Sequence, residues 1–94
     1  MVEVRNNPER ARYEAVEGDD VVGMITYRSE DGVLALLHTE VNKDHEGQGI
    51  AGKIANLALE DAAESGVLLN PVCPYVRGYL EKHPDLASQI NLVR

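Results

Sequence analysis

The hydrophobic pattern of this chain changes its period at about residue 42, and this change limits its possible folds more than any other feature. Before it, apolar and β-branched residues form short stretches between turn sequences, which is typical of strands. After it, apolar residues recur at helical spacing, namely at Ile50, Ile54, Leu57, Ala58 and Ala62. We therefore expect a single domain over residues 1–94 in which a sheet packs against helices.

The first half predicts an antiparallel meander of three strands. Residues 10–17 alternate, and residues 21–27 are rich in β-branched and apolar side chains after a Gly-Asp-Asp turn. A second turn, Ser-Glu-Asp-Gly, precedes residues 33–41, the most apolar stretch, which we expect to be buried on both faces. Residues 2–5 add a fourth strand if they pair.

The second half predicts a helix, a short strand and another helix. The first helix begins at Ile50 and ends before Gly66, and residues 67–72 follow as a strand in which Pro71 requires an edge position or a distorted end. Pro74 suits the first position of the last helix, with Cys73 as its N-cap. The fold class is therefore α+β, with a mixed, mostly antiparallel sheet (a meander, then a β-α-β unit) and two main helices.

Composition excludes several classes of function. The formal net charge is −7, from 9 basic and 16 acidic residues, which has the wrong sign for nucleic-acid binding. No apolar run is long enough to span a membrane, and the first residues lack an apolar signal sequence. The chain has one cysteine, and its three histidines lack metal-ligand spacing. We expect a cytoplasmic protein with no metal site, no nucleic-acid partner and no membrane association.

The most informative segment is the glycine-containing loop between the last predicted strand of the meander and the first helix, residues 41–53. Two glycines, Gly47 and Gly49, let the backbone approach a ligand closely, and the free N–H groups of the first helical turn suit a phosphate. The spacing is neither a dinucleotide fingerprint nor a P-loop. An ordinary strand-to-helix turn that needs glycine is the alternative.

The segment Glu46-Gly47-Gln48-Gly49-Ile50-Ala51 resembles the acyl-CoA motif of the GNAT superfamily of N-acetyltransferases, written Gln/Arg-x-x-Gly-x-Gly/Ala. It matches at Gly49 and Ala51 and departs at Glu46, where the motif has Gln or Arg. The segments His38-Thr39-Glu40-Val41, Cys73-Pro74-Tyr75-Val76 and His83-Pro84 resemble a branch of very short GNAT-like proteins. The resemblance spans about residues 10–85 and lacks the helical section with which longer members shape the acceptor site.

The resemblance implies that acetyl-CoA or CoA binds as co-substrate. Pantetheine would pair with the backbone of Thr39, Glu40 and Val41, and the pyrophosphate would contact N–H groups between Gln48 and Gly52. Lysine or arginine side chains add charge near the adenosine phosphates or are ordinary surface residues. The expected cofactor-binding residues are Thr39, Val41, Gln48, Gly49, Ile50, Ala51, Gly52 and Lys53, with Lys43 and Arg77 as further candidates.

His38 and Glu40 are two residues apart on a predicted strand and therefore share one face. Acetyl transfer needs a base for the incoming ammonium group, and either side chain can serve, directly or through water. The alternative is a strand-end pair that bonds to a loop backbone.

Cys73 and Tyr79 are the candidates for stabilising or protonating the departing CoA thiolate. At a helix N-cap the dipole favours the thiolate of Cys73, which is also a conceivable acyl-accepting nucleophile, and the resemblance implies a catalytic cysteine here. A small buried hydrophobic residue is the alternative. Tyr79 resembles the tyrosine of the superfamily's last helix, and a buried core tyrosine is its alternative.

We therefore predict an acetyl-CoA-dependent N-acetyltransferase that acts on an amine, either a small molecule or a peptide lysine. A non-catalytic CoA-binding or protein-interaction domain on the same scaffold is the first alternative, and an unrelated α+β module without a ligand is the second. The sequence leaves the acceptor and the oligomeric state open.

Overall fold

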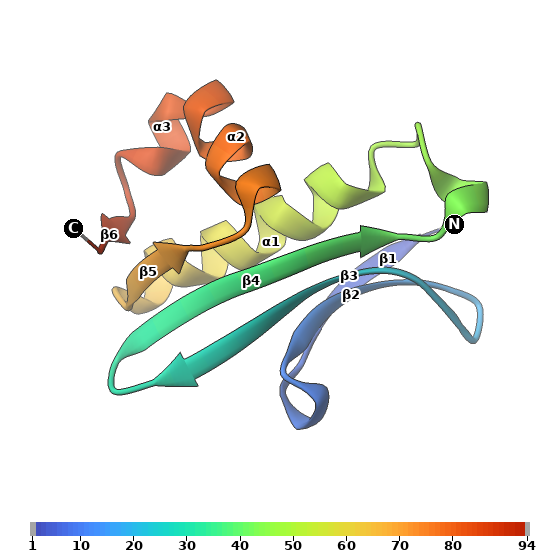
Figure 1. The fold of residues 1–94 in the computed structure, drawn as a ribbon, viewed down its shortest axis with the longest axis horizontal. Coiled ribbons are helices and arrows are strands. Elements are labelled where there is room, and N and C mark those ends of the chain that lie inside the picture. The colour runs from blue at the N-terminus through green and yellow to red at the C-terminus, as the bar shows by residue number, and fades with distance from the viewer. Residues whose placement is uncertain (1, 94) are drawn as a thin grey trace.

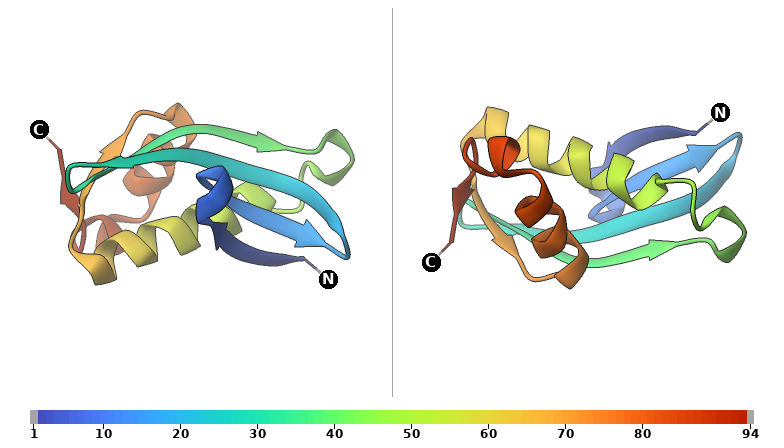
Figure 2. Two further views of the ribbon diagram at one scale, coloured as in Figure 1. Left: turned by 90° about the horizontal axis from the view of Figure 1, so that it is seen from below. Right: turned by 90° about the horizontal axis from the view of Figure 1, so that it is seen from above.

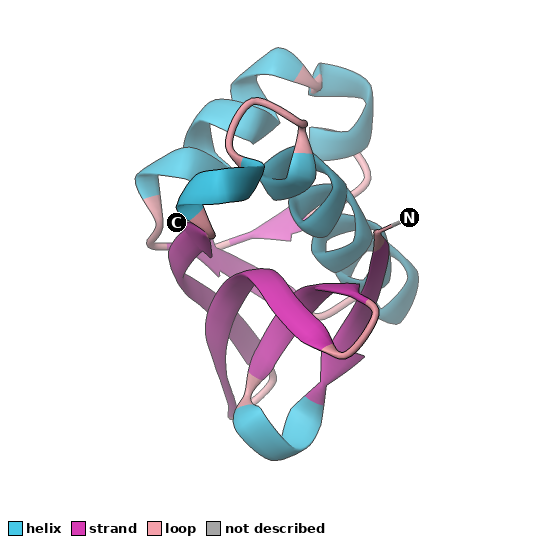
Figure 3. Ribbon diagram, turned by 90° about the vertical axis from the view of Figure 1, so that its right-hand side faces the viewer, coloured by secondary structure: helices cyan, strands magenta, loops and turns pink. Residues whose placement is uncertain are grey.

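The computed structural model describes residues 2–93, in which six strands form one sheet and the α-helices lie on one side of it (Figure 1, Figure 3). Figure 2 shows α2 and α3 beside α1 on this side. The elements in chain order are β1 (Glu3–Asn7), the 3₁₀ turn η1 (Pro8–Arg10), β2 (Arg12–Glu17), β3 (Asp20–Glu30), β4 (Val33–Val41), the 3₁₀ turn η2 (Lys43–His45), α1 (Ile50–Ser65), β5 (Leu68–Pro71), α2 (Pro74–Lys82), α3 (Pro84–Ala87) and β6 (Asn91–Leu92).

The strands follow one another in the sheet in chain order, from β1 to β6. The first four pair antiparallel, and β5 and β6 then add parallel to β4. The predicted α+β fold, a meander followed by a β-α-β unit, is therefore confirmed, and the N-terminal residues do pair, as β1. The elements α3 and β6 were not predicted, because one turn of helix and a two-residue strand are too short to show a hydrophobic period.

The core lies between the sheet and the apolar face of α1. Of the residues that the helical period predicted, Ile50, Ile54, Ala58 and Ala62 are buried and Leu57 is partly buried. Ala55 and Leu59, which were not predicted, are also fully buried. They belong to one cluster with buried side chains of the strands, including Ile25, Leu36 and Leu69.

The expectation that residues 33–41 are buried on both faces is wrong. Only Leu34 and Leu36 of β4 are buried, and His38 and Glu40 are exposed. The physical reason is that the α-helices cover a single face of the sheet (Figure 3), so β4 has one packed face and one open face. An apolar run predicts a buried strand without showing how many faces are covered.

A β-bulge in β4 reverses which residues face the helices. Its pairing with β3 passes from Thr26–His38 to Tyr27–Leu36, which leaves Leu37 as an extra residue. Leu34 and Leu36 therefore face the core before the bulge, whereas Thr39 and Val41 do so after it. His38 and Glu40 are consequently on the open face.

Gly23 of β3 fixes how closely the start of α1 approaches the sheet, and its replacement by valine is expected to lower the free energy of unfolding by about 1–3 kcal/mol. A Cβ atom at this position would lie 3.0 Å from Cγ2 of Ile50 and 3.2 Å from Cδ1 of Ile54. Urea denaturation measures the loss. Gly78→Ala is the control, because a Cβ there meets no atom within 4 Å and alanine should stabilise α2 by about 0.5–1 kcal/mol. A Gly23→Val protein of unchanged stability would contradict the close approach.

Glu14 is the one charged side chain of the described residues that is buried, at 1% exposure, and it lies on the open face of the sheet. Its carboxylate accepts hydrogen bonds from Arg12 Nε at 2.6 Å, Arg5 Nε at 3.0 Å and Asn7 Nδ2 at 3.2 Å. Burial by itself raises the pKa of Glu14, but these three hydrogen bonds outweigh it and hold the pKa below its ordinary value. None of the described α-helices covers this face of the sheet, and the arginine side chains cover Glu14 there instead.

This pKa shift predicts a pH dependence of stability. Because the pKa is lowered on folding, the carboxylate stabilises the folded state fully above its unfolded pKa of about 4.3, and the contribution is lost as the pH falls through the lower folded pKa. Glu14→Gln should cost about 1–3 kcal/mol at pH 7 and should unfold with a flatter pH dependence below pH ~4.5. Urea midpoints from pH 7 to 3 measure both effects. Glu3→Gln, at an exposed site of β1, should behave as the wild type.

Candidate functional site

The candidate site lies along the part of β4 that, within residues 2–93, has no neighbouring strand on one side. β5 pairs with Val33–Leu36 of β4 only and ends at Pro71, which has no N–H with which to continue the ladder. The N–H of Cys73 donates to the carbonyl oxygen of Leu36 at 2.9 Å as the chain leaves the sheet. The predicted distorted end at Pro71 is thus confirmed, and the rest of β4 runs on without a strand partner on this side (Figure 1).

The backbone of this unpaired edge offers hydrogen-bonding groups to a ligand. Asn42 donates its N–H to Val22 of β3 at 2.7 Å, and alternate residues of a strand direct their backbone groups to opposite sides. The backbone groups of Thr39 and Val41 therefore point away from β3, toward the unpaired edge. These are two of the residues predicted to contact a cofactor.

A cavity of about 260 Å³ lies at the end of this edge, between Val41, the glycine loop, the first turn of α1 and Tyr75. Gly49, with φ +73°, is the N-cap of α1 and has no side chain that could cap the helix. The N–H groups of the first turn therefore have neither a side-chain acceptor at the cap nor an intrahelical acceptor. The side chain of Ile50 is buried, so this residue offers the cavity its backbone.

Two other predicted cofactor residues lie differently. Gln48 is exposed in the loop before α1. The N–H of Lys53 already donates to the carbonyl oxygen of Gly49 at 3.1 Å. Lys53 lines a second pocket, of about 520 Å³, which adjoins the cavity because Gly49 and Gly52 line both. The glycine loop also places His45 at the cavity, with an Nδ1 atom that is buried and has no hydrogen-bond partner among the described residues.

Cys73 lies at the point where β4 and β5 separate. It is 3% exposed and is the N-cap of α2, as predicted. Its thiol makes no capping hydrogen bond but lies 3.1 Å from Oγ1 of Thr39. Two candidate residues that are 34 positions apart in the sequence are therefore in direct contact beside the unpaired edge.

Tyr75 is a residue of the cavity that was not predicted from the sequence. Its hydroxyl approaches Gly52, since a Cβ atom on that glycine would lie 3.5 Å from it. Burial raises the pKa of Tyr75, and the negative charge of a nearby Cys73 thiolate raises it further. The signal available in the sequence was its position directly after Pro74, in the first turn of the helix that Cys73 caps.

Tyr79, the predicted candidate, makes other contacts. Its hydroxyl donates to Oδ1 of Asn56 at 3.2 Å, and its ring stacks on His83 with centroids 3.9 Å apart. Burial raises its pKa, with smaller contributions from Tyr75 and Glu60. Tyr79 thus lines the second pocket, with Lys53, and is not among the residues of the cavity at Val41. Its ring nevertheless approaches Gly52, which lines both, since a Cβ atom on that glycine would lie 3.7 Å from Cε2 of Tyr79.

His38 and Glu40 lie on the same face of β4, as predicted, with Nε2 of His38 3.2 Å from Oε1 of Glu40. Both side chains are more than half exposed, at 64% and 62%, along a pocket of about 510 Å³ on the open side of the strand. A proton acceptor thus lies on one side of β4, and the Cys73 thiol lies on the other. This arrangement suits a reaction in which an amine and an acyl donor approach the strand edge from opposite faces.

Two negative observations concern residues 2–93. No group of three or more His, Cys, Asp or Glu side chains in this range is arranged to hold a metal ion. None of the helices described there has the length and apolar character needed to cross a membrane.

Comparison with known proteins finds a matching family model and solved structures of similar fold. A family model described as GCN5-related N-acetyl-transferase matches residues 12–90. The NMR structure of a protein from Staphylococcus aureus, described as a "GCN5-like putative N-acetyltransferase", is similar in fold, with a TM-score of 0.71 at 20% sequence identity. That similarity covers 98% of this chain and 90% of the other. A search of curated proteins found none that matches.

Proposed function

Because the chain belongs to the GCN5-related N-acetyltransferase family, we propose that it is an acetyl-CoA-dependent enzyme that transfers an acetyl group to an amine. The observation that carries this proposal is the unpaired edge of β4 beside the glycine loop and the N-terminus of α1. Thr39 and Val41 supply backbone groups for the pantetheine amides, and the first turn of α1 supplies N–H groups for the pyrophosphate.

Acetyl-CoA would supply the acetyl group as a thioester. A backbone N–H of the unpaired edge, from Thr39 or Val41, is placed to polarise the carbonyl. Glu40 or His38, on the open face of β4, accepts the proton of the attacking amine. The Cys73 thiol, beside Thr39, stabilises or protonates the departing thiolate. The exposed position of the His38–Glu40 pair supports an acceptor that approaches from solvent, such as a small amine or a peptide lysine.

Two measurements test the proposal in sequence. The first is a thermal-shift titration with acetyl-CoA, CoA and ATP, in which a ligand at 100 times its dissociation constant stabilises the folded state by about 2.7 kcal/mol. In a domain of this size, that corresponds to a shift of roughly 10–20 °C. We expect a shift with acetyl-CoA and CoA and none with ATP. No shift with either CoA compound would overturn the proposal.

The second measurement is the release of free thiol from acetyl-CoA in the presence of a panel of amines and lysine peptides. An amine-dependent release is expected for an acetyltransferase. A binding domain would show the same thermal shift with CoA and acetyl-CoA but no release with any amine.

A further inference from the structure

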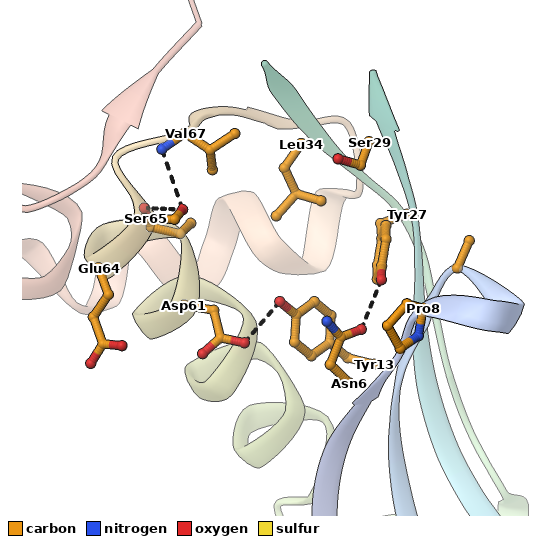
Figure 4. Close-up of a pocket in the computed structure, with 12 residues that line it drawn as sticks. Asn6, Pro8, Tyr13, Tyr27, Ser29, Leu34, Asp61, Glu64, Ser65 and Val67 are labelled. Carbon is orange, nitrogen blue, oxygen red and sulfur yellow. Dashed lines mark hydrogen bonds between the residues drawn. The ribbon is translucent and has the colours of Figure 1, made fainter. Parts of the chain in front are cut away.

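A pocket of about 820 Å³, larger than the three described above, shares no residue with the cavity at the unpaired edge. It lies between the C-terminal half of α1 and the strands β1 to β4, with η1 beside it (Figure 4). Pockets of this size commonly hold small molecules. The acetyltransferase chemistry proposed above gives it no role.

Two tyrosine rings form one wall of the pocket. Tyr13 and Tyr27 have centroids 5.4 Å apart and ring planes tilted by 53°. Both hydroxyl groups are already used as donors, Tyr13 to Oδ2 of Asp61 at 3.0 Å and Tyr27 to Oδ1 of Asn6 at 2.8 Å (Figure 4). The rings are thereby held in place, and their donors are not available to an anionic ligand.

The charged groups of the pocket are all negative. Asp61 and Glu64 line it from α1, and its lining contains no lysine, arginine or histidine. The two carboxylates are three residues apart on a helix and therefore neighbours on its surface. Neither makes a salt bridge within residues 2–93, so no cation of that part of the chain neutralises them. Carboxylates and aromatic faces both attract cations.

The connection between β1 and β2 lines the pocket and contains a residue with a strained backbone conformation. Ala11 ends η1 with φ 51° and ψ 53°, a left-handed conformation that costs an alanine about 1–2 kcal/mol. Its carbonyl oxygen accepts a hydrogen bond from the N–H of Tyr27 at 2.9 Å, which fixes the connection against β3. Strain of this kind is concentrated at binding and catalytic sites.

We propose that this pocket binds an organic cation, namely a primary ammonium group attached to a small apolar body. The ammonium group donates to the carboxylate of Asp61, and the exposed carboxylate of Glu64 adds negative charge (Figure 4). The apolar body packs against the rings of Tyr13 and Tyr27 and against Leu34. This site is separate from the unpaired edge of β4, so the proposal does not depend on the function proposed above.

A two-dimensional amide NMR titration with phenethylammonium chloride tests the proposal. We expect saturable shifts of amide signals at Tyr27, Leu34, Asp61 and Val67, without displacement by CoA. The neutral analogue 2-phenylethanol has nearly the same shape and should bind at least about 10-fold more weakly, because it cannot form the charged hydrogen bonds. Equal binding of the two compounds, shifts confined to residues 47–52, or no saturable shift would each overturn the proposal.

Asp61→Asn isolates the contribution of charge, since an amide oxygen can still accept the hydrogen bond from Tyr13. We expect it to weaken phenethylammonium binding about 10-fold or more, whereas Asp85→Asn, in α3, changes the net charge equally and should leave binding unchanged. If Asp61→Asn fails to fold, the exposed Glu64→Gln takes its place with the same expected direction. Wild-type affinity in the carboxylate variant that folds would overturn the proposal.

Discussion

Gly49→Val should abolish CoA binding and leave a folded domain. Gly49 has φ +73°, and a Cβ atom there would meet no protein atom within 4 Å, so the added Cβ atom clashes with nothing in the folded chain. It would instead occupy the open space over the first turn of α1, where the proposed pyrophosphate contacts the N–H groups. The left-handed backbone costs about 1–2 kcal/mol of stability. Calorimetric titration should show CoA affinity reduced by at least about 100-fold, which corresponds to the loss of two charge-assisted hydrogen bonds.

Gly66→Val is a closely matched control for that result. Gly66 caps the other end of the same helix, also with φ +73°, and a Cβ atom there would likewise meet no atom within 4 Å. Its valine variant should lose a similar amount of stability and keep wild-type affinity for CoA. Loss of CoA binding in both variants would assign the effect to stability, and retained binding in Gly49→Val would mean that the phosphates lie elsewhere.

Most of the fold could be predicted because its signals are local. The helical period from Ile50 to Ala62, the glycine after α1 and the Cys73-Pro74 pair before α2 each act through neighbouring residues, and each predicted boundary is close to the observed one. The parallel addition of β5 then follows from the length of the connecting helix and the short loops around it.

Other features that were missed depend on pairing between distant segments. The bulge at Leu37 exists only in the register between β3 and β4, and it decides that Thr39 faces the helices while His38 faces solvent. An apolar run such as residues 33–37 has the same sequence whether one or two layers cover it. The open face of β4 could therefore not be predicted from β4 alone.

Candidate residues of the site could be named from the sequence, but their arrangement in space could not. The glycine motif identified the start of α1, and spacing identified the His38–Glu40 face. The contact between Cys73 and Thr39 and the position of Tyr75 over Gly52 both require α2 to be docked on α1 and β4. The choice between Tyr75 and Tyr79, four residues apart on one helix face, is likewise a matter of docking.

Cys73→Ala should lower turnover by about 100-fold or more while CoA affinity changes by less than about 3-fold, as expected when a proton donor is removed but the binding groups stay in place. The thiol is buried beside the unpaired edge, 3.1 Å from Oγ1 of Thr39, whereas the proposed CoA contacts are backbone groups of β4 and α1. The rate of thiol release from acetyl-CoA with a saturating amine measures turnover, and calorimetry measures affinity.

Three further variants separate a reacting thiol from one that only fills space. Thr39→Val keeps the thiol and the volume but removes the hydroxyl contact, so a turnover near the wild-type value would show that Cys73 acts without that partner. Tyr79→Phe should be nearly silent, because its hydroxyl bonds to Asn56, whereas Tyr75→Phe removes a hydroxyl from the cavity itself. Unchanged turnover in Cys73→Ala with a marked loss in Tyr75→Phe would identify Tyr75 as the proton donor to the thiolate. Its side chain lines the cavity beside Gly49 and Gly52.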